Sequence, residues 1–169
     1  MKGMAYMSPK PLKDEWLTPP EILQELGPFD LDPCSPEKRP WDTAKKHLTF
    51  RDNGLLHPCD GYVWLNPPYG KQTKVWLERM AMHNNGIALV FARTETDMFF
   101  RFVWAKATSI MFLRGRIKFY HADGTQAESD GGAPSVLIAY GKEADRRLKK
   151  VRYGRYIKLK YSPFLKLFT

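Results

Sequence analysis

Apolar and polar residues along this chain follow strand-length and helix-length patterns in turn. Residues 87–92 are a continuous apolar run whose length fits a strand buried on both faces. Residues 73–82 place apolar side chains at helical spacing, and Asn84-Asn85-Gly86 ends this amphipathic helix. The surrounding order of strand, helix, strand, helix, strand builds βαβ units. The pattern therefore predicts an α/β domain with a largely parallel sheet and helices on its faces.

The remaining predicted elements flank this centre. Strands are expected at 29–33, 61–65, 109–120, 135–140 and, as an edge strand, 153–161. Helices are expected at 21–26, 96–106 and 143–150, with Thr18 as the cap of the first one. Residues 34–60 and 122–132 are rich in turn signals and are expected to be irregular. Residues 1–13 lack periodicity, so we expect a flexible leader before a single domain at 14–169.

The strand expected at 61–65 ends in Asn66-Pro67-Pro68-Tyr69, a tetrapeptide suited to methylation of an exocyclic amine. Such an amine is a poor nucleophile because its lone pair is delocalised into the ring. Acceptors for both N–H hydrogens would draw the nitrogen toward tetrahedral geometry, and the Asn66 amide oxygen and the Pro67 carbonyl can supply them. The ring of Tyr69 offers a face on which a base taken out of a duplex can stack. A plain strand followed by a Pro-Pro turn would also produce this sequence.

Two acidic residues are expected at a similar position in the fold. Asp30 and Asp32 lie at the end of the short strand at 29–33, as Asn66 lies at the end of its own strand. Ligands of α/β sheets bind at the carboxyl ends of strands. This agreement favours a common site, with Asp32 a stronger candidate for ligand contact than Asp30, which is as compatible with a plain strand end.

Composition and charge narrow the class of partner. The length of 169 residues suits one domain, and there is neither an apolar run of about 18 residues nor a signal-peptide pattern, so we expect a cytoplasmic protein with no membrane partner. The two cysteines fit reduced thiols. The net charge of +9 is concentrated in residues 142–169, whereas residues 1–141 are close to neutral. A basic segment on a near-neutral body indicates a nucleic acid, although a solvated surface has the same composition.

Several motifs occur together in a specific order: Thr18-Pro19-Pro20, residues 29–35 (FDLDPCS), residues 52–55 (DNGL), residues 64–70 (WLNPPYG) and residues 115–119 (GRIKF). In this order the chain resembles the small phage-type DNA N6-adenine methyltransferases, a Dam-like family, over roughly residues 14–141. The resemblance implies S-adenosylmethionine as methyl donor, S-adenosylhomocysteine as product, a reduced Rossmann-like methyltransferase fold of about five to seven strands, and adenine in double-stranded DNA as acceptor. It also implies a protein encoded by a phage or prophage and acting in the bacterial host cell.

The resemblance assigns roles by position. The catalytic motif is Asn66, Pro67, Pro68 and Tyr69. The donor would be held by Trp16, Thr18, Pro19, Asp30, Asp32, Pro33, Cys34, Asp52 and Asn66. Larger methyltransferases have a Gly-rich loop where this chain has residues 33–36 (PCSP), so the mode of donor binding departs from theirs. Trp41 is a further candidate for stacking on the donor or the base, whereas Trp64 and Trp76 are expected in the core.

DNA contacts have to come from short elements, since no recognition domain is inserted. The candidates are the loop at 122–132, a second subunit, and the basic residues Arg93, Arg114, Arg116, Arg146, Arg147, Lys149 and Lys150. No metal is expected, because Cys34, His47, His57 and Cys59 have no common zinc spacing and transfer from a sulfonium requires none. Methylation of RNA or of a protein glutamine on the same fold, and an inactive DNA-binding module, remain as alternatives.

Overall fold

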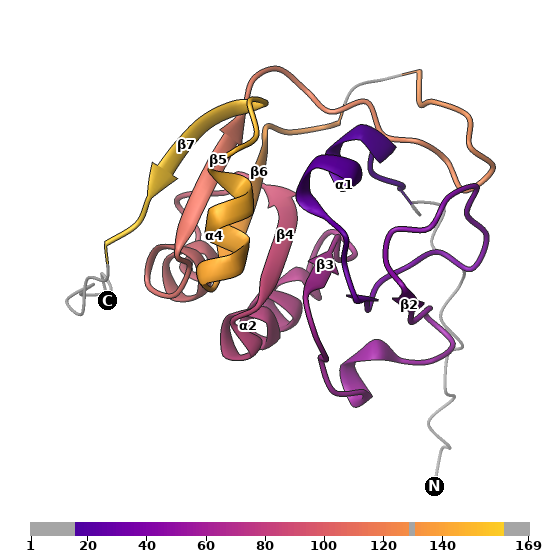
Figure 1. Ribbon diagram of the computed structural model, residues 1–169, viewed down its shortest axis with the longest axis horizontal. Coiled ribbons are helices and arrows are strands. Elements are labelled where there is room, and N and C mark those ends of the chain that lie inside the picture. The colour runs from indigo at the N-terminus through magenta and orange to yellow at the C-terminus, as the bar shows by residue number, and fades with distance from the viewer. Residues whose placement is uncertain (1–15, 129–130, 161–169) are drawn as a thin grey trace, which may run out of the picture.

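The computed structural model describes residues 16–128 and 131–160, which form a seven-stranded sheet with helices on both faces (Figure 1). The expected leader at 1–13 lies outside the described residues. The strands are β1 (Leu31–Asp32), β2 (Lys46–His47), β3 (Val63–Leu65), β4 (Gly86–Phe91), β5 (Ser109–Leu113), β6 (Ser135–Tyr140) and β7 (Gly154–Lys158). The helices are α1 (Pro20–Leu26), η1 (Gly54–Leu56), α2 (Thr73–His83), α3 (Asp97–Phe99), η2 (Phe100–Trp104) and α4 (Lys142–Leu148).

The sheet is mixed, and the prediction of a largely parallel sheet is wrong. Its order is β2-β1-β3-β4-β6-β5-β7. Pairing is parallel from β2 to β4, but β6 runs antiparallel to both β4 and β5, and β7 runs antiparallel to β5. The cause is the connection from β5 to β6, which contains no crossover helix to carry the chain back to the starting edge. β6 therefore returns antiparallel and inserts between β4 and β5.

Strands β1 to β5 nevertheless all point the same way, because β6 is antiparallel to both β4 and β5. Their carboxyl ends meet along one side of the sheet, here called the carboxyl edge. Asp32 is the last residue of β1, and Asn66, Arg93 and Arg114 follow β3, β4 and β5 within two positions. Ligand sites of α/β sheets form at such an edge.

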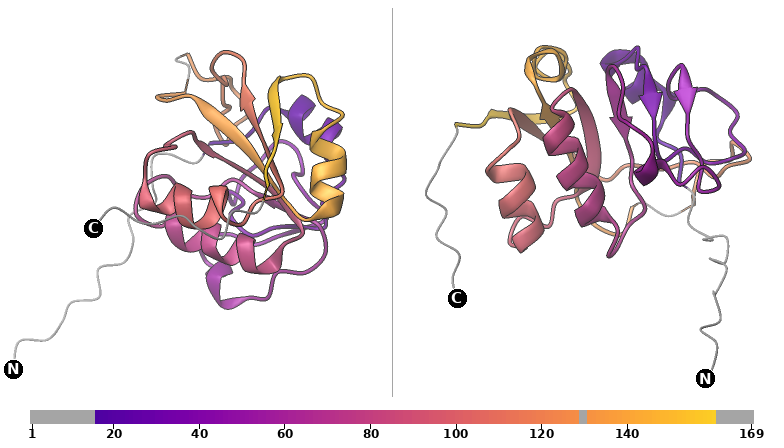
Figure 2. Two further views of the ribbon diagram at one scale, coloured as in Figure 1. Left: turned by 90° about the vertical axis from the view of Figure 1, so that its left-hand side faces the viewer. Right: turned by 90° about the horizontal axis from the view of Figure 1, so that it is seen from below.

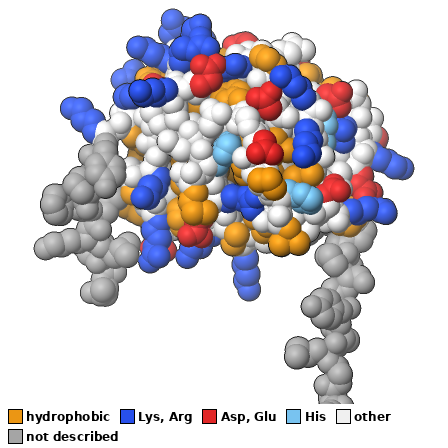
Figure 3. Space-filling model, turned by 60° about the horizontal axis from the view of Figure 1, so that its bottom comes forward, with side chains coloured by type: hydrophobic (Ala, Val, Ile, Leu, Met, Phe, Trp, Pro, Cys, Tyr) orange, Lys and Arg blue, Asp and Glu red, His pale blue; other side chains and the backbone are white. Residues whose placement is uncertain are grey.

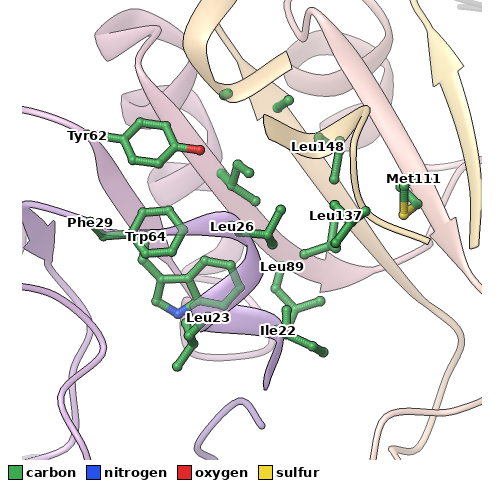
Figure 4. Close-up of a cluster of buried hydrophobic side chains, with 14 of the residues drawn as sticks. Ile22, Leu23, Leu26, Phe29, Tyr62, Trp64, Leu89, Met111, Leu137 and Leu148 are labelled. Atoms are coloured by element: carbon green, nitrogen blue, oxygen red, sulfur yellow. The ribbon is translucent and has the colours of Figure 1, made fainter. Parts of the chain in front are cut away.

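Two hydrophobic layers hold the helices against the sheet. On one face, side chains of α1 and α4 pack with Trp64 of β3 and with Ile87 and Leu89 of β4 (Figure 4). On the other face, α2, α3 and η2 pack with Ala88 and Val90. Figure 2 shows the sheet between these two helical layers. The alternation along β4 explains its continuous apolar run, because both of its faces are buried.

Most element boundaries follow the predictions closely. The strand at 135–140 is confirmed to the residue, the helix at 73–82 extends to His83, and β7 is an edge strand as expected. The helix at 96–106 is shorter, because α3 continues as the π-helical turn η2 and ends at Trp104. Trp64 and Trp76 are buried in the core as predicted.

Four predictions about local structure are wrong. β5 ends at Leu113, not at 120, because Gly115 adopts a positive φ of 79° that breaks the strand. Residues 34–60 contain β2, whose two polar residues give no strand pattern. Thr18 does not cap α1, since the N-cap residue is Pro19. Asp30 precedes β1, so it lies at the opposite edge of the sheet from Asn66.

Candidate active site

Asn66 directly follows β3, and one end of its side-chain amide is fixed by the backbone. Asn66 Nδ2 donates to the carbonyl oxygen of Trp16, 2.9 Å away. Since a backbone carbonyl can only accept, this bond determines which end of the amide is the nitrogen. The other end, Asn66 Oδ1, is buried and has no hydrogen-bond partner among the described residues. A buried acceptor without a partner is costly, so this oxygen is prepared for a donor from outside the chain.

The rest of the tetrapeptide contacts α2 through Pro68 and β4 through Tyr69. The carbonyl oxygen of Pro68 accepts from the hydroxyl of Thr73, the first residue of α2, at 2.9 Å. The ring of Tyr69 stacks on Phe91 with centroids 4.1 Å apart and planes 14° apart. Burial raises the pKa of the Tyr69 hydroxyl far above its usual range, and this buried hydroxyl has no partner among the described residues. Tyr69 is therefore a neutral, half-buried ring held flat by Phe91.

Residues 16–18 reach Asn66 from the N-terminal side. Leu17 exchanges two backbone hydrogen bonds with Tyr120, at 2.8 and 2.9 Å. The ring of Trp16 lies 4.9 Å from the ring of His121. Thr18, two residues along from the carbonyl that holds Asn66, is 1% exposed, and its hydroxyl has no partner in the described part of the chain. The segment thus brings a second unpaired polar atom to the carboxyl edge.

Asp32 is buried at the end of β1 and organises the turn that follows. Its Oδ1 accepts from the backbone N–H of Cys34 at 3.0 Å, and its Oδ2 accepts from the hydroxyl of Thr43. Burial raises the pKa of Asp32 to about 6, against the opposing effect of these two donors. Burial also raises the pKa of the Cys34 thiol, which is therefore not a thiolate nucleophile. The turn at 33–35 that replaces a Gly-rich loop is thus built around the Asp32 carboxylate.

Asp30 and Asp52 each accept hydrogen bonds from nearby groups of the chain. The Asp30 carboxylate accepts from Lys45 Nζ and from the backbone N–H of Tyr62, both at 2.8 Å, and the Lys45 bond lowers its pKa. The exposed Asp52 accepts from the backbone N–H and the hydroxyl of Thr49, at 2.7 and 2.8 Å, and the backbone bond lowers its pKa. Each carboxylate therefore stabilises a local connection.

The comparisons with known proteins decide the family. Residues 6–153, most of the chain, match the family model described as DNA N-6-adenine-methyltransferase (Dam). The chain belongs to this family. It accordingly transfers a methyl group to the N6 amine of adenine in DNA, and the family implies S-adenosylmethionine as the donor. Neither the curated proteins nor the solved structures gave a match.

Aromatic residues of this methyltransferase line the carboxyl edge beyond β1. Trp41 lies edge-on to Tyr120 at 5.1 Å, and its buried indole N–H has no partner among the residues described. Beside this pair an open cleft of about 440 Å³ separates the loop at 37–42 from Ala122 and Asp123. No sequence pattern singled out Phe91, Tyr120 or His121, although Phe91 belongs to the apolar run at 87–92 and Tyr120 follows the motif at 115–119.

Three of the predicted DNA-binding residues are exposed at the same edge as Asn66. Arg93 follows β4, and Arg114 and Arg116 follow β5. Arg116 Nη1 donates to the carbonyl of Gly131 at 3.1 Å. The connection from α4 to β7 also meets the sheet here, because the Arg114 N–H donates to the carbonyl of Tyr153 at 2.9 Å. Lys149 and Lys150 in that connection are exposed. Lys and Arg side chains also gather at the upper left of Figure 3, on the side of the molecule that carries α4 and β7.

Arg146 and Arg147 are instead engaged within the protein. Both pair with Glu143, at 2.7 and 2.6 Å. Arg147 also donates to the carbonyls of Leu26 and Gly27, at the end of α1, and its guanidinium lies 4.5 Å from the centroid of the Tyr62 ring. Arg147 therefore ties α4 to α1.

Residues 16–128 and 131–160 contain neither a candidate metal site nor a membrane-spanning helix. No group of three or more His, Cys, Asp or Glu side chains there could hold a metal ion. Nor does that part of the chain contain a helix long and apolar enough to cross a membrane.

Proposed function

We propose that the chain methylates adenine that has been taken out of double-stranded DNA, with Asn66 Oδ1 and the Pro67 carbonyl oxygen as acceptors for the two N6 hydrogens. The observation that carries this proposal is the unpaired, buried Asn66 Oδ1, whose direction is fixed by the bond from Nδ2 to Trp16. An adenine amine inside a duplex is out of reach of such a buried acceptor. The base therefore has to be extruded before it can react.

Asn66 and Pro67 make the amine more nucleophilic. Acceptance of both hydrogens pulls the nitrogen out of conjugation with the ring, so that its lone pair becomes available. S-adenosylmethionine, when bound, supplies a methyl group on a positively charged sulfur. The alkylated amine carries the positive charge and loses one proton to solvent, while Asn66 Oδ1 retains its bond to the other hydrogen. Preorganised acceptors of this kind contribute about 10²–10³ in rate.

The unpaired polar atoms at the carboxyl edge fit the donor. The Thr18 hydroxyl and the Trp41 indole N–H are buried without partners among the described residues, and each can bond a polar group of S-adenosylmethionine. Asp32 contributes indirectly, because its two oxygens hold Cys34 and Thr43 near the carboxyl end of β1. Five codirectional strands with the site at their carboxyl ends support a reduced Rossmann-like methyltransferase fold, formed by residues 14–169 as one domain.

Tyr69 supplies the surface on which the extruded base stacks. One face of its ring is covered by Phe91, so the base would use the opposite face. Stacking of a base on an aromatic side chain is worth about 1–3 kcal/mol and tolerates any base, so the selectivity for adenine rests on the two acceptors. A base that presents a carbonyl oxygen at that position would meet Asn66 Oδ1 with another acceptor.

The test is transfer of labelled methyl from S-adenosylmethionine to matched polymers. The purified chain is incubated with a duplex DNA of mixed sequence, the same sequence as RNA, and a glutamine-containing peptide. The product is identified as N6-methyladenine by mass spectrometry of nucleosides. We expect label in the duplex DNA alone. Label predominantly in RNA or peptide, or none at all, would overturn the proposal.

A further inference from the structure

The connection between β5 and β6 is much longer than its ends require. β5 and β6 are antiparallel neighbours, which two to five residues can join. The chain instead uses residues 114–134, of which residues 114–128 cross above α1 to the side of the molecule that carries β2 (Figure 1). Long connections in compact domains are commonly functional. This one crosses the carboxyl edge, where Asn66 lies.

Residues 119–127 of this connection fold into a closed turn, called here the 119–127 hairpin. Its backbone is paired by bonds from the N–H of Ala127 to the carbonyl of Phe119, 2.8 Å, and from the N–H of His121 to the carbonyl of Thr125, 2.9 Å. Asp123 Oδ1 accepts from the N–H and the hydroxyl of Thr125 at 2.8 and 2.6 Å. The hairpin is thus held together by its own hydrogen bonds.

The hairpin contacts two other segments at the carboxyl edge, residues 16–17 and Trp41. On one side, Tyr120 pairs with Leu17 and His121 lies on Trp16, whose carbonyl holds the Asn66 amide. On the other side, Tyr120 meets Trp41 edge-on. A base pair next to the extruded adenine would therefore lie within reach of the hairpin side chains.

The hairpin lacks the basic residues that are found in the segment directly before it. Residues 119–127 contain no Lys or Arg, whereas the exposed Arg114, Arg116 and Lys118 precede them directly. Lys and Arg contacts to phosphates position a protein on DNA, and neutral donors and acceptors distinguish base edges. Within the hairpin, His121, Thr125 and Gln126 are exposed, and Gln126 carries both a donor and an acceptor at the end of its side chain.

We propose that the 119–127 hairpin selects the bases that flank the target adenine, with Gln126 as a specificity-determining residue. A two-stranded ribbon fits the major groove, and a Gln side chain can make two bonds to one base there. Arg114, Arg116 and Lys118 hold the adjacent phosphates. The inference rests on the proposed methylation of duplex DNA and adds the element that chooses the site.

The test uses a pool of DNA duplexes with randomised bases around one adenine, and sequencing that maps N6-methyladenine. The variants are Gln126→Ala, Gln126→Glu and, as the matched phosphate variant, Lys118→Gln. One good bidentate contact corresponds to roughly ten- to hundredfold discrimination. We expect Gln126→Ala to lose preference of that size at one flanking position, and Gln126→Glu to change the favoured base there. Lys118→Gln should lower methylation of all sites alike.

The outcomes separate this inference from the proposed function. A parent protein that methylates selectively, with both Gln126 variants showing the same preference, overturns the role of the hairpin and leaves the activity intact. So does a parent that methylates adenines in every context equally. A parent that methylates no DNA adenine overturns both. Melting temperatures check that the variants are folded. We expect values close to that of the parent, because among the described residues the Gln126 side chain makes only one long bond, 3.4 Å, to the Tyr120 hydroxyl.

Discussion

The side-chain amide of Asn66 is held by the backbone carbonyl of Trp16, 50 residues earlier in the chain, at 2.9 Å. This bond leaves only the oxygen end of the amide free, so the acceptor for the adenine amine is oriented before substrate arrives. The carbonyl is in turn positioned by the pairing of Leu17 with Tyr120. The catalytic amide, the N-terminal segment and the 119–127 hairpin are therefore one connected unit.

The stacking of Tyr69 on Phe91 predicts that the tyrosine ring is required and its hydroxyl is not. The hydroxyl is buried without a partner among the residues described, so Tyr69→Phe should keep activity within about threefold and should not lower the free energy of unfolding by more than about 0.5 kcal/mol. Tyr69→Ala should lower kcat/KM by about tenfold or more, through loss of base stacking. Steady-state kinetics on duplex DNA measure both. Inactivity of Tyr69→Phe would show that the hydroxyl contacts substrate.

The buried carboxyl of Asp32 predicts a pH dependence of stability. Its pKa is about 6 in the folded protein, above the ordinary value of 3.8 that holds in the unfolded chain, so folding favours the protonated form. The stabilisation is complete below about pH 4 and is lost as the pH rises through 6. The free energy of unfolding of the parent minus that of Asp32→Asn should therefore decrease by up to roughly 3 kcal/mol between pH 4 and pH 7.5, because only the parent loses this stabilisation. Urea titrations at several pH values measure it, and a constant difference would contradict the burial argument.

The basic residues of α4 and its end should divide into structural and DNA-facing groups. Arg147→Ala removes bonds to Glu143 and to the end of α1, so we expect a loss of roughly 1–3 kcal/mol in the free energy of unfolding, with no change in the salt slope of DNA binding. The double variant Lys149→Gln, Lys150→Gln should lower the salt slope of DNA binding and leave the free energy of unfolding unchanged. Each lost phosphate contact lowers the log–log salt slope by about 0.9. An unchanged slope in the double variant would remove both lysines from the DNA interface.

Much of the fold follows from local sequence patterns, and the exceptions have physical causes. β6 was predictable because its apolar run lies between turn residues, whereas β2 consists of Lys46 and His47 and exists only through pairing with β1. The antiparallel insertion of β6 between β4 and β5 is a choice of neighbour, which hydrophobic periodicity does not encode. Local patterns therefore predicted elements better than their arrangement.

The same limit applies to the site. The motif at Asn66 was visible as a contiguous tetrapeptide at a strand end. The carbonyl of Trp16 and the hydroxyl of Thr43 hold Asn66 and Asp32, and no sequence pattern indicated either of these two contacts. Asp30 and Asp52 match family motifs, yet each is engaged in a local connection. Motifs thus found the reactive group, and only the folded chain shows what orients it.

The most direct test of the central claim compares Asn66→Ala with Asn85→Ala. Asn85 Nδ2 also donates to a backbone carbonyl, that of Gly61, at 2.9 Å, but it lies at the opposite edge of the sheet. Single-turnover methylation of duplex DNA and calorimetric binding of S-adenosylhomocysteine are measured on the same samples. We predict that Asn66→Ala lowers the methylation rate by about 10²–10³ with donor affinity retained, and that Asn85→Ala leaves both close to the parent. A methylation rate in Asn66→Ala near that of the parent would contradict the assignment of Asn66 Oδ1 as the acceptor for the adenine amine.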